Sequence, residues 1–227
     1  MKNSGKVNGV TTPSKKTLLF DLDGTLVDSF PGIRTSFLHT LHEKNWEIPS
    51  EERISQVPGP PMEWTFQDLG MTPEQAQDAL QTYLEHYGQV GWDLSEAFPG
   101  MRDLLIRLKY EGFRLCTATS KGEFFAEKVL RKFEMFDLFE FMGAATDNGN
   151  RRSKSAVIKH VLDSVGLDEP NDILMIGDRS HDIEGSSEFG IDCVAVTWGY
   201  GSKTEWDAAR YTVSTAEELE RIIHDWA

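Results

Sequence analysis

The sequence predicts an α/β protein in which a parallel sheet is covered by helices on both faces and a small α-helical cap domain is inserted after the first strand. Short, almost continuously apolar runs alternate with stretches of helical periodicity, which is typical of parallel strands buried on both faces. Residues 31–95, by contrast, contain no clear strand pattern. The 227 residues, 39% hydrophobic and 26% charged, suffice for one core domain and one smaller insert.

The core is predicted from five short apolar runs and the helical patterns between them. The predicted strands are Thr17–Phe20, Arg114–Thr119, Phe141–Ala145, Ile173–Ile176 and Cys193–Val196. The predicted core helices are Met101–Tyr110, Gly122–Phe133 and Ser155–Val165, each with apolar residues at helical spacing. Because a helix between two strands acts as a crossover connection, the strands should run parallel in a Rossmann-like sheet.

Residues 31–95 are predicted to form the cap domain. Four helices are expected there, at Gly32–Lys44, Glu51–Gln56, Glu63–Leu69 and Pro73–Gly88. The core then comprises residues 16–30 and 96–227, and the chain enters and leaves the cap near residues 28–31 and 95–99. Residues 1–15 are polar and rich in Gly, Ser and Thr, and are predicted to be a leader that adds little to the fold.

The charge and cysteine content narrow the functional classes. A formal net charge of -14 disfavours nucleic acid polymers and anionic membranes as partners, although a few local cations can still bind a small anionic substrate. Cys116 and Cys193 lie in apolar runs and are predicted to be buried, reduced thiols. No apolar run is long enough for a membrane span or a signal peptide, so a cytoplasmic location is expected. Monomer and dimer both stay open.

Charged and hydroxyl side chains follow the ends of the predicted strands. They are Asp21 and Asp23 after the first strand, Thr119 and Ser120 at the end of the second, Asp178 and Asp182 after the fourth, and Lys154 before the helix that leads to the fourth. Because the carboxyl ends of parallel strands meet at one edge of a sheet, we expect these side chains to converge.

Four carboxylates in one place require a counter-charge. Two unit charges about 4 Å apart repel by roughly 4 kcal/mol at an effective dielectric of 20, so some acids stay protonated or a cation lies among them. Oxygen ligands without cysteine or paired histidine select a hard cation, and Mg²⁺ fits best. Because Mg²⁺ commonly keeps coordination positions for substrate phosphate, the site predicts a small phosphorylated metabolite as its substrate.

The residues around the carboxylates suit phosphate chemistry. A helix expected to begin just after Thr119-Ser120 would direct free N–H groups at the site, and Lys154 would supply a fixed positive charge. Of Asp21 and Asp23, one can attack phosphorus while the other protonates the departing oxygen and then activates water. The alternative, that both merely cap a turn, is disfavoured by the motifs downstream.

Together these motifs resemble the haloacid dehalogenase-like (HAD) superfamily. The resemblance spans roughly residues 16–223 and rests on the motif D-L-D-G-T-L at 21–26, on Thr119, on Lys154 and on G-D-R-S-H-D at 177–182. It implies Asp21 as nucleophile and Mg²⁺ ligand, Asp23 as general acid–base and backbone-carbonyl ligand, Thr119, Ser120 and Lys154 as phosphoryl-binding residues, Asp178 as Mg²⁺ ligand, and Asp182 as a water-mediated ligand or a residue that orients Lys154.

The cap resembles that of the phosphoglycolate phosphatase-like and 5′-nucleotidase-like branch, and an Asp at position 23 suits a phosphatase. The resemblance therefore implies a Mg²⁺-dependent phosphatase that hydrolyses a small phosphomonoester, such as phosphoglycolate or a nucleoside 5′-monophosphate, through an aspartyl-phosphate. A phosphomutase of the β-phosphoglucomutase type, a pyrophosphatase and a non-catalytic binding protein stay open as alternatives. Three further residues have two readings each: His181 as metal ligand or rim residue, Arg34 as anion contact or exposed side chain, and Lys121 as substrate contact or not.

Overall fold

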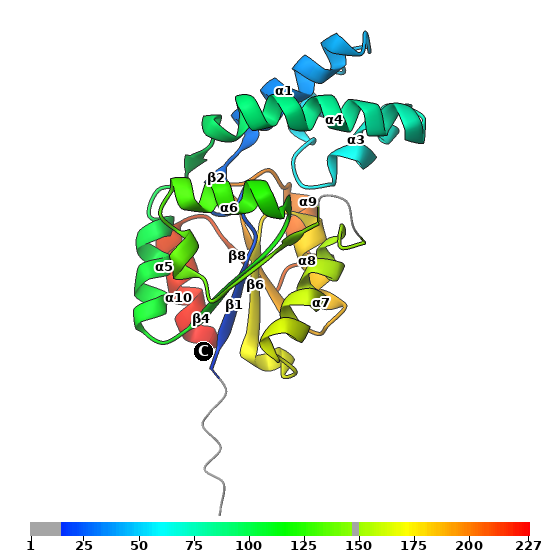
Figure 1. Cartoon of the computed structure of the whole chain (residues 1–227). Helices are drawn as coiled ribbons and strands as arrows, with labels where there is room; N and C mark the ends of the chain where they lie inside the picture. Colours follow the sequence, from blue (N-terminus) through cyan, green and yellow to red (C-terminus); the bar gives the residue numbers. More distant parts are fainter. Residues whose placement is uncertain (1–14, 147–149) are drawn as a thin grey trace, which may run out of the picture.

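The computed structural model of the chain describes residues 15–146 and 150–227, so the predicted leader lies outside the described part except for Lys15. At its centre is a six-stranded, fully parallel sheet in the order β5-β4-β1-β6-β7-β8, with helices on either side and a helical cap above it (Figure 1). The strands are β1 (Thr17–Phe20), β4 (Arg114–Gly122), β5 (Phe141–Ala145), β6 (Ile173–Gly177), β7 (Asp192–Val196) and β8 (Tyr211–Val213).

Alternating side chains of the strands build two separate apolar layers. Leu18 and Phe20 of β1 face α5, α6 and α10, whereas Leu19 faces α7 and α8; all three side chains are fully buried. This alternation follows from the two-residue period of a strand, and it requires apolar residues at every position because both faces are covered. The core helices are α5 (Met101–Tyr110), α6 (Glu123–Lys132), α7 (Lys154–Val165), α8 (Ser180–Ser187), α9 (Lys203–Trp206) and α10 (Ala216–Trp226).

The strand order places the ends of three strands side by side. The chain runs from β1 to β4 and β5 on one side, then crosses to β6 and β7 on the other, so β1 lies between β4 and β6. In register, Phe20 lies beside Thr117 of β4 and Ile176 of β6. Such a reversal of strand order leaves a crevice at the carboxyl edge of the sheet, where ligands of open α/β folds bind.

The cap is built from helices that share a core of their own. Its helices are α1 (Phe30–Glu43), α2 (Glu51–Ser55), α3 (Met62–Asp68) and α4 (Pro73–Gln89). Phe37 and Phe66 stack at its centre with ring centroids 5.8 Å apart, and both are fully buried. At the start of α4, Thr72 and Gln75 form a reciprocal capping box with Pro73 in the first turn, which fixes where this helix begins.

Two very short strands connect the cap to the core. β2 (Val27–Asp28) and β3 (Glu96–Ala97) pair antiparallel, so the two chain crossings lie side by side at the base of the cap. The sequence predicts linkers here rather than strands, because two residues are too few for a periodic pattern. A short 3₁₀ helix, η1 (Gly91–Leu94), precedes β3; η2 (Phe136–Leu138) and η3 (Pro170–Asp172) lie in the core.

The predicted fold class is confirmed, with some differences in detail. All five predicted strands and the four cap helices are present, whereas β8 was missed because it is only three residues long. The helix predicted just after Ser120 begins instead at Glu123, because β4 continues through an irregular register to Gly122. The boundaries 31 and 95 of the cap stay a prediction.

Two further features of the described residues bear on the sequence analysis. Cys116 and Cys193 are buried and unpaired by any disulfide, as expected. Within residues 15–146 and 150–227, no helix has both the length and the apolar character that a membrane crossing requires.

Candidate active site

Asp21 is the first residue beyond β1 and lies at the centre of the sheet's carboxyl edge. Its backbone N–H donates to the Ile176 carbonyl of β6 (2.9 Å), which continues the sheet pairing by one residue. Its Oδ1 accepts hydrogen bonds from the Leu22 N–H (2.8 Å) and from Lys154 Nζ (2.9 Å). The carboxylate is thus held in one orientation, and its side chain is among the few charged ones that are buried.

Three carboxylates from two strand ends form one buried cluster. Asp21, Asp178 and Asp182 each offer an oxygen that lies within 4.8 Å of the other two. Asp182, in the first turn of α8, accepts the backbone N–H groups of Asp178 and Arg179, both at 3.0 Å. The loop after β6 is therefore folded around Asp182, which brings Asp178 towards Asp21.

Lys154 joins the carboxylates. Ser153 caps α7 by accepting the Ala156 N–H, and this cap fixes Lys154 as the first residue of the helix. Lys154 Nζ lies 2.9 Å from Asp21 Oδ1 and 2.7 Å from Asp182 Oδ1, and it also donates to the Ala118 carbonyl (2.8 Å). Its side chain is only 4% exposed, so the ammonium is fixed rather than mobile.

Asp178 lies in a cradle that only glycine backbones can form. A Cβ on Gly24 would lie 2.3 Å from Asp178 Oδ2, and one on Gly199 would lie 2.4 Å from it. Gly24 also has a φ of +84°, which other residues adopt at a cost. The same Oδ2 accepts the Tyr200 N–H at 2.6 Å. Gly24 of the D-L-D-G-T motif is therefore required by close approach as well as by its turn.

The site carries more negative charge than its lysines balance. Burial, followed by the nearby Asp182 and Asp23, raises the pKa of Asp21 to about 6 although Lys154 opposes the shift. Burial, together with Asp182 and Asp21, also raises the pKa of Asp178. Four carboxylates, including Asp23, share this edge with two ammonium groups, which leaves a formal charge of −2.

This surplus charge suits a divalent cation. The donors are carboxylate oxygens without sulfur or nitrogen, the set that Mg²⁺ prefers. Asp21 and Asp178 would hold the ion, with Asp182 close enough to take part directly or through water. His181 does not belong to this group in the described part of the chain, so its reading as a rim residue is favoured.

Asp23 lies beside the cluster and contacts the cap. Lys121 Nζ donates to both of its carboxylate oxygens, at 3.1 and 3.0 Å, and also to the Tyr87 hydroxyl of α4 at 2.7 Å. Ser29 Oγ donates to Asp23 from the other side. Burial opposes the charge on Lys121, but Asp23 and then Tyr87 raise its pKa above the ordinary lysine value. Lys121 is therefore a cation shared between core and cap.

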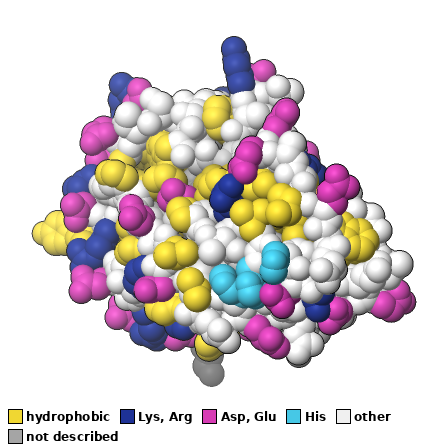
Figure 2. Space-filling model, turned by 90° about the horizontal axis from the view of Figure 1, so that it is seen from above, with side chains coloured by type: hydrophobic (Ala, Val, Ile, Leu, Met, Phe, Trp, Pro, Cys, Tyr) yellow, Lys and Arg dark blue, Asp and Glu magenta, His cyan; other side chains and the backbone are white. Residues whose placement is uncertain are grey.

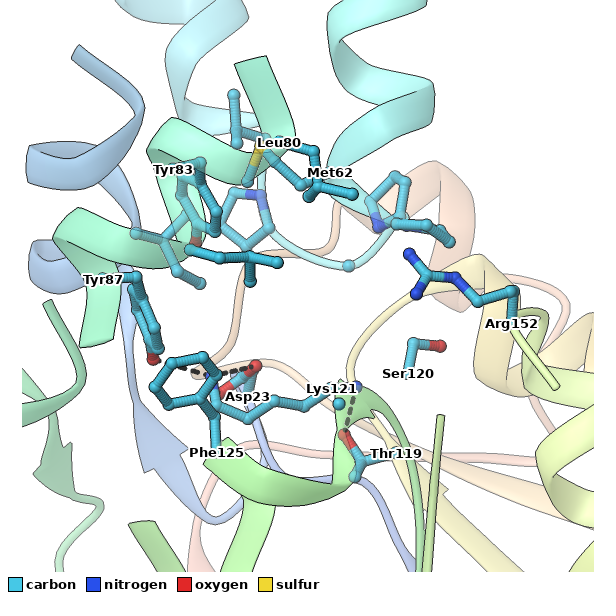
Figure 3. Close-up of a pocket in the computed structure, with 18 of the residues that line it drawn as sticks. Asp23, Met62, Leu80, Tyr83, Tyr87, Thr119, Ser120, Lys121, Phe125 and Arg152 are labelled. Carbon is cyan, nitrogen blue, oxygen red and sulfur yellow. Dashed lines mark hydrogen bonds and ion pairs between the residues drawn. The ribbon is translucent and has the colours of Figure 1, made fainter. Parts of the chain in front are cut away.

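A pocket extends from these carboxylates into the cap (Figure 3). Its floor contains Asp21, Asp23, Thr119, Ser120 and Lys121, and its walls come from α1, α3, α4 and the first turn of α6. The Thr119 hydroxyl accepts the Lys121 N–H (3.2 Å), which leaves its own proton available for a ligand. The centres of water molecules can occupy about 110 Å³ of it, well above the ~10–15 Å³ that one water needs.

Core side chains hold the cap over this pocket. Arg152, on the loop before α7, forms an ion pair with Glu63 of α3. Arg179 donates to the Pro58 carbonyl of the cap and forms an ion pair with Glu205 of α9. Together with the contact between Lys121 and Tyr87, the Arg152 and Arg179 contacts connect the core to the cap.

The structure brings the seven predicted site residues to one place. Four of them are linked by the Lys154 ion pairs or the carboxylate cluster, and the other three lie on the pocket floor. Arg34, in contrast, pairs with Glu51 at the surface (2.7 Å) and does not line the pocket.

Sequence reasoning missed two tyrosines. Tyr87 lay unremarked in a cap helix. Tyr200, within the string G-Y-G-S at 199–202, binds Asp178 through its N–H and contacts Asp28 and Ser29 at the cap base through its hydroxyl. The glycines around Tyr200 were the available signal for a tight loop.

Fold and site together define a hydrolase of the phosphatase type, with its acids at the switch point of a parallel sheet and a helical cap above them. The chain belongs to the haloacid dehalogenase-like hydrolase family, whose sequence profile matches residues 18–196.

Comparison with individual proteins gives similar relatives with different names. The chain is 39% identical over 214 residues to the tyrosine-protein kinase PtkA of Mycobacterium tuberculosis, covering 92% of this chain and 73% of that protein. It is 36% identical to a 5′-nucleotidase of Pseudomonas aeruginosa, covering 86% and 88%. A predicted phosphatase from Clostridium acetobutylicum has a similar structure, with a TM-score of 0.88, 30% identity and coverage of 93% and 100%.

We predict that Mg²⁺ stabilises the protein through Asp178. Because the ion binds only the folded site, it should raise the Tm by roughly 5–10 °C at about a hundred times its Kd. In Asp178→Asn the shift should be lost, whereas Asp225→Asn, an exposed change on α10, should keep it. Thermal unfolding with and without Mg²⁺ measures this. An undiminished shift in Asp178→Asn would place the ion elsewhere.

The raised pKa of Asp21 predicts a pH dependence of stability without metal. The folded state binds the Asp21 proton more tightly than the unfolded state, in which the pKa of this carboxyl is near 3.8. The stability that this protonation contributes is therefore complete below pH 3.8 and is lost as pH rises through about 6. The free energy of unfolding of the wild type, relative to Asp21→Asn, should therefore fall by up to about 1.4 kcal/mol per pH unit between pH 4 and 6. Urea unfolding in EDTA tests this; a difference that is constant or rises would contradict it.

Proposed function

We propose that this protein is a Mg²⁺-dependent phosphatase that hydrolyses a small phosphomonoester through a phosphorylated Asp21. The observation that supports this most directly is the position of Asp21, which is fixed by Lys154 and lies at the floor of a pocket large enough for a small ligand. An aspartate that is held in one orientation by a buried lysine and that lines a pocket is arranged as a nucleophile for a phosphoryl group.

In the first half of the reaction, Asp21 attacks phosphorus. The bond between the Asp21 carboxylate oxygen and phosphorus forms while the ester P–O bond breaks. The departing oxygen takes a proton from Asp23, which enters this step protonated and regains its proton from water in the second half. Thr119 and the backbone around Ser120, which line the pocket, would donate to the phosphoryl oxygens, and Lys154 beside Asp21 would supply positive charge. A bound Mg²⁺ would neutralise charge on the transferring group.

In the second half, water releases phosphate and regenerates Asp21. Asp23 accepts a proton from the attacking water, whose oxygen bonds to phosphorus as the Asp21–phosphorus bond breaks. The two hydrogen bonds from Lys121 and the one from Ser29 hold the Asp23 carboxylate in position for both transfers. The cap covers the site and limits the entry of bulk water.

The relatives support the reaction class and leave the substrate open. One bears the name 5′-nucleotidase, which agrees with a nucleoside 5′-monophosphate as the candidate substrate; phosphoglycolate is the second candidate from the sequence resemblance. Both are small phosphomonoesters.

Transfer to an acceptor other than water is the second candidate function. The similarity to a protein named tyrosine-protein kinase favours a phenol as acceptor, while a phosphomutase would return the phosphoryl group to a sugar. All of these reactions can share a phosphorylated Asp21, so they differ in the group that attacks it. Incubation of the ³²P-labelled enzyme with water alone, with a tyrosine peptide or with a sugar phosphate distinguishes them.

Asp21→Asn should reduce kcat for p-nitrophenyl phosphate at least about a thousandfold, because an amide oxygen is a poor nucleophile. The fold should be retained, since the two side chains have the same shape. Phosphate release with Mg²⁺ and circular dichroism measure the two effects. Asp163→Asn, an exposed change on α7, is the matched control. A variant that keeps a tenth of the wild-type rate would rule out this nucleophile.

In Asp23→Asn, the transfer of the phosphoryl group from alkyl phosphates to Asp21 should be slower by roughly 10²–10⁴-fold. The same step with p-nitrophenyl phosphate should be slowed much less, because a good leaving group needs no proton. Single-turnover measurements of alcohol release across a series of leaving-group pKa values test this. An equal loss for every ester would show that Asp23 does not act as the acid.

A further inference from the structure

We propose that the pocket above Asp21 binds an uncharged aromatic ring, so that the preferred substrate is a phosphomonoester whose ring is attached to the ester oxygen directly or through a short carbon chain. This inference rests on the proposed phosphatase function and specifies its substrate class. It is drawn from the chemistry of the pocket walls, which neither the reaction nor the family determines.

The cap gives the pocket an apolar wall. Among the described residues that line it, every cap residue is uncharged, and most are aliphatic, proline or aromatic. Leu80 and Met62 point down from the cap towards the floor, opposite the catalytic residues (Figure 3). Acidic and basic side chains are instead scattered over the outer face of the molecule as seen from above (Figure 2). The cap therefore offers a leaving group apolar contact and no counter-charge.

Three aromatic side chains form one side of the pocket. Tyr83 and Tyr87 are stacked with centroids 5.6 Å apart and planes at 17°, while Tyr87 meets Phe125 edge-on at 5.0 Å and 88°. Burial raises the pKa of both tyrosine hydroxyls, so these rings stay neutral. The Tyr87 ring already has Tyr83 stacked on it and Lys121 Nζ 4.7 Å from its centroid. The half-buried Phe125 ring and the edges of the tyrosine rings therefore provide the surface that a further flat ring can contact, stacked or edge-on.

In the described part of the chain, the two cations that line the pocket are already matched by carboxylates. Lys121 faces Asp23, and Arg152 faces Glu63 and donates to the Thr146 carbonyl at 2.9 Å. A second anionic group on the substrate, such as the carboxylate of phosphoglycolate or the second phosphate of pyrophosphate, would have to compete with these partners. A neutral leaving group has no such competition.

The distance between the aromatic wall and the catalytic acid limits the length of the carbon chain between the substrate's ring and its ester oxygen. The Tyr87 hydroxyl and the Asp23 carboxylate bind the same Lys121 ammonium, at 2.7 and 3.0–3.1 Å. The wall thus begins one side chain away from the acid that faces the leaving oxygen. A ring on that oxygen, or one or two carbons away, reaches the wall, whereas a nucleobase is separated from its phosphate by a ribose.

The first test compares esters that differ only in the ring. 2-Phenylethyl phosphate and ethyl phosphate have similar leaving-group pKa values, so the ratio of their kcat/KM reports ring binding rather than acid catalysis. We expect a ratio of about ten or more for the wild type, from burial of the ring. A ratio near one overturns the proposal. So does a tenfold preference for adenosine 5′-monophosphate or for phosphoglycolate over 2-phenylethyl phosphate.

Binding of non-hydrolysable analogues separates this inference from the phosphatase proposal. Benzylphosphonate should bind the wild type with Mg²⁺ at least about tenfold more tightly than methylphosphonate by titration calorimetry. Should this hold while no ester is hydrolysed, the ring site stands and the phosphatase function fails. If the two phosphonates bind equally well to an enzyme that does hydrolyse p-nitrophenyl phosphate, the ring site is wrong and the phosphatase function stands.

A charge introduced into the wall should change the preference. Leu84, half-buried on α4, lines the pocket, and Gln77 lies exposed on the same helix outside it. Leu84→Lys should lower the ratio for the ester pair about tenfold and increase kcat/KM for phosphoglycolate, while Gln77→Lys should keep the wild-type ratio. An unchanged ratio in a folded Leu84→Lys, checked by circular dichroism, contradicts the proposal. If that variant does not fold, the wild-type phosphonate pair decides.

Discussion

The central constraint on this structure is that several negatively charged side chains lie close together at one buried edge of the sheet. Three carboxylates with oxygens within 4.8 Å of one another would repel strongly if nothing lay between them. Lys154 neutralises part of this charge, because its ammonium group forms ion pairs with both Asp21 and Asp182. Burial, and after it the neighbouring carboxylates, raise the pKa of Asp21 and of Asp178. A cluster of carboxylate oxygens with this surplus of negative charge is the donor set that suits a divalent cation.

The core and the cap supply different kinds of side chain to the pocket. Among the described residues that line the pocket, all the charged side chains belong to the core, and the cap supplies apolar and aromatic surface. They meet at Lys121, which binds Asp23 of the core and Tyr87 of the cap, so the position of the proposed acid depends on the cap being in place. Tyr200 makes a similar connection between Asp178 and the base of the cap. Two side chains, Lys121 and Tyr200, thus connect the carboxylate edge of the sheet to the cap.

This division also accounts for the variety of names among similar proteins. Proteins named as a kinase, a nucleotidase and a predicted phosphatase match most of this chain. In the proposed reaction the core motifs contact only the phosphoryl group, whereas the leaving group and the attacking group would be selected by side chains above the sheet. Similarity of the core therefore supports the reaction class more strongly than it supports any one substrate.

The sequence by itself determined the sheet, the helical insert and the residue types of the site. Each rests on local physics: continuous apolar runs require two covered faces, the interruption at residues 31–95 requires a separate helical unit, and D-x-D-G-T requires a turn at a strand end. It could not give β2, β3 or β8, because two or three residues carry no period. Only the tertiary structure decided that Lys121 pairs with Asp23 and that Tyr87 joins them, because these partners lie 34 to 98 residues apart in the chain. Their contact exists only because the packed cap brings α4 down onto the end of β4, a long-range arrangement that no sequence window contains.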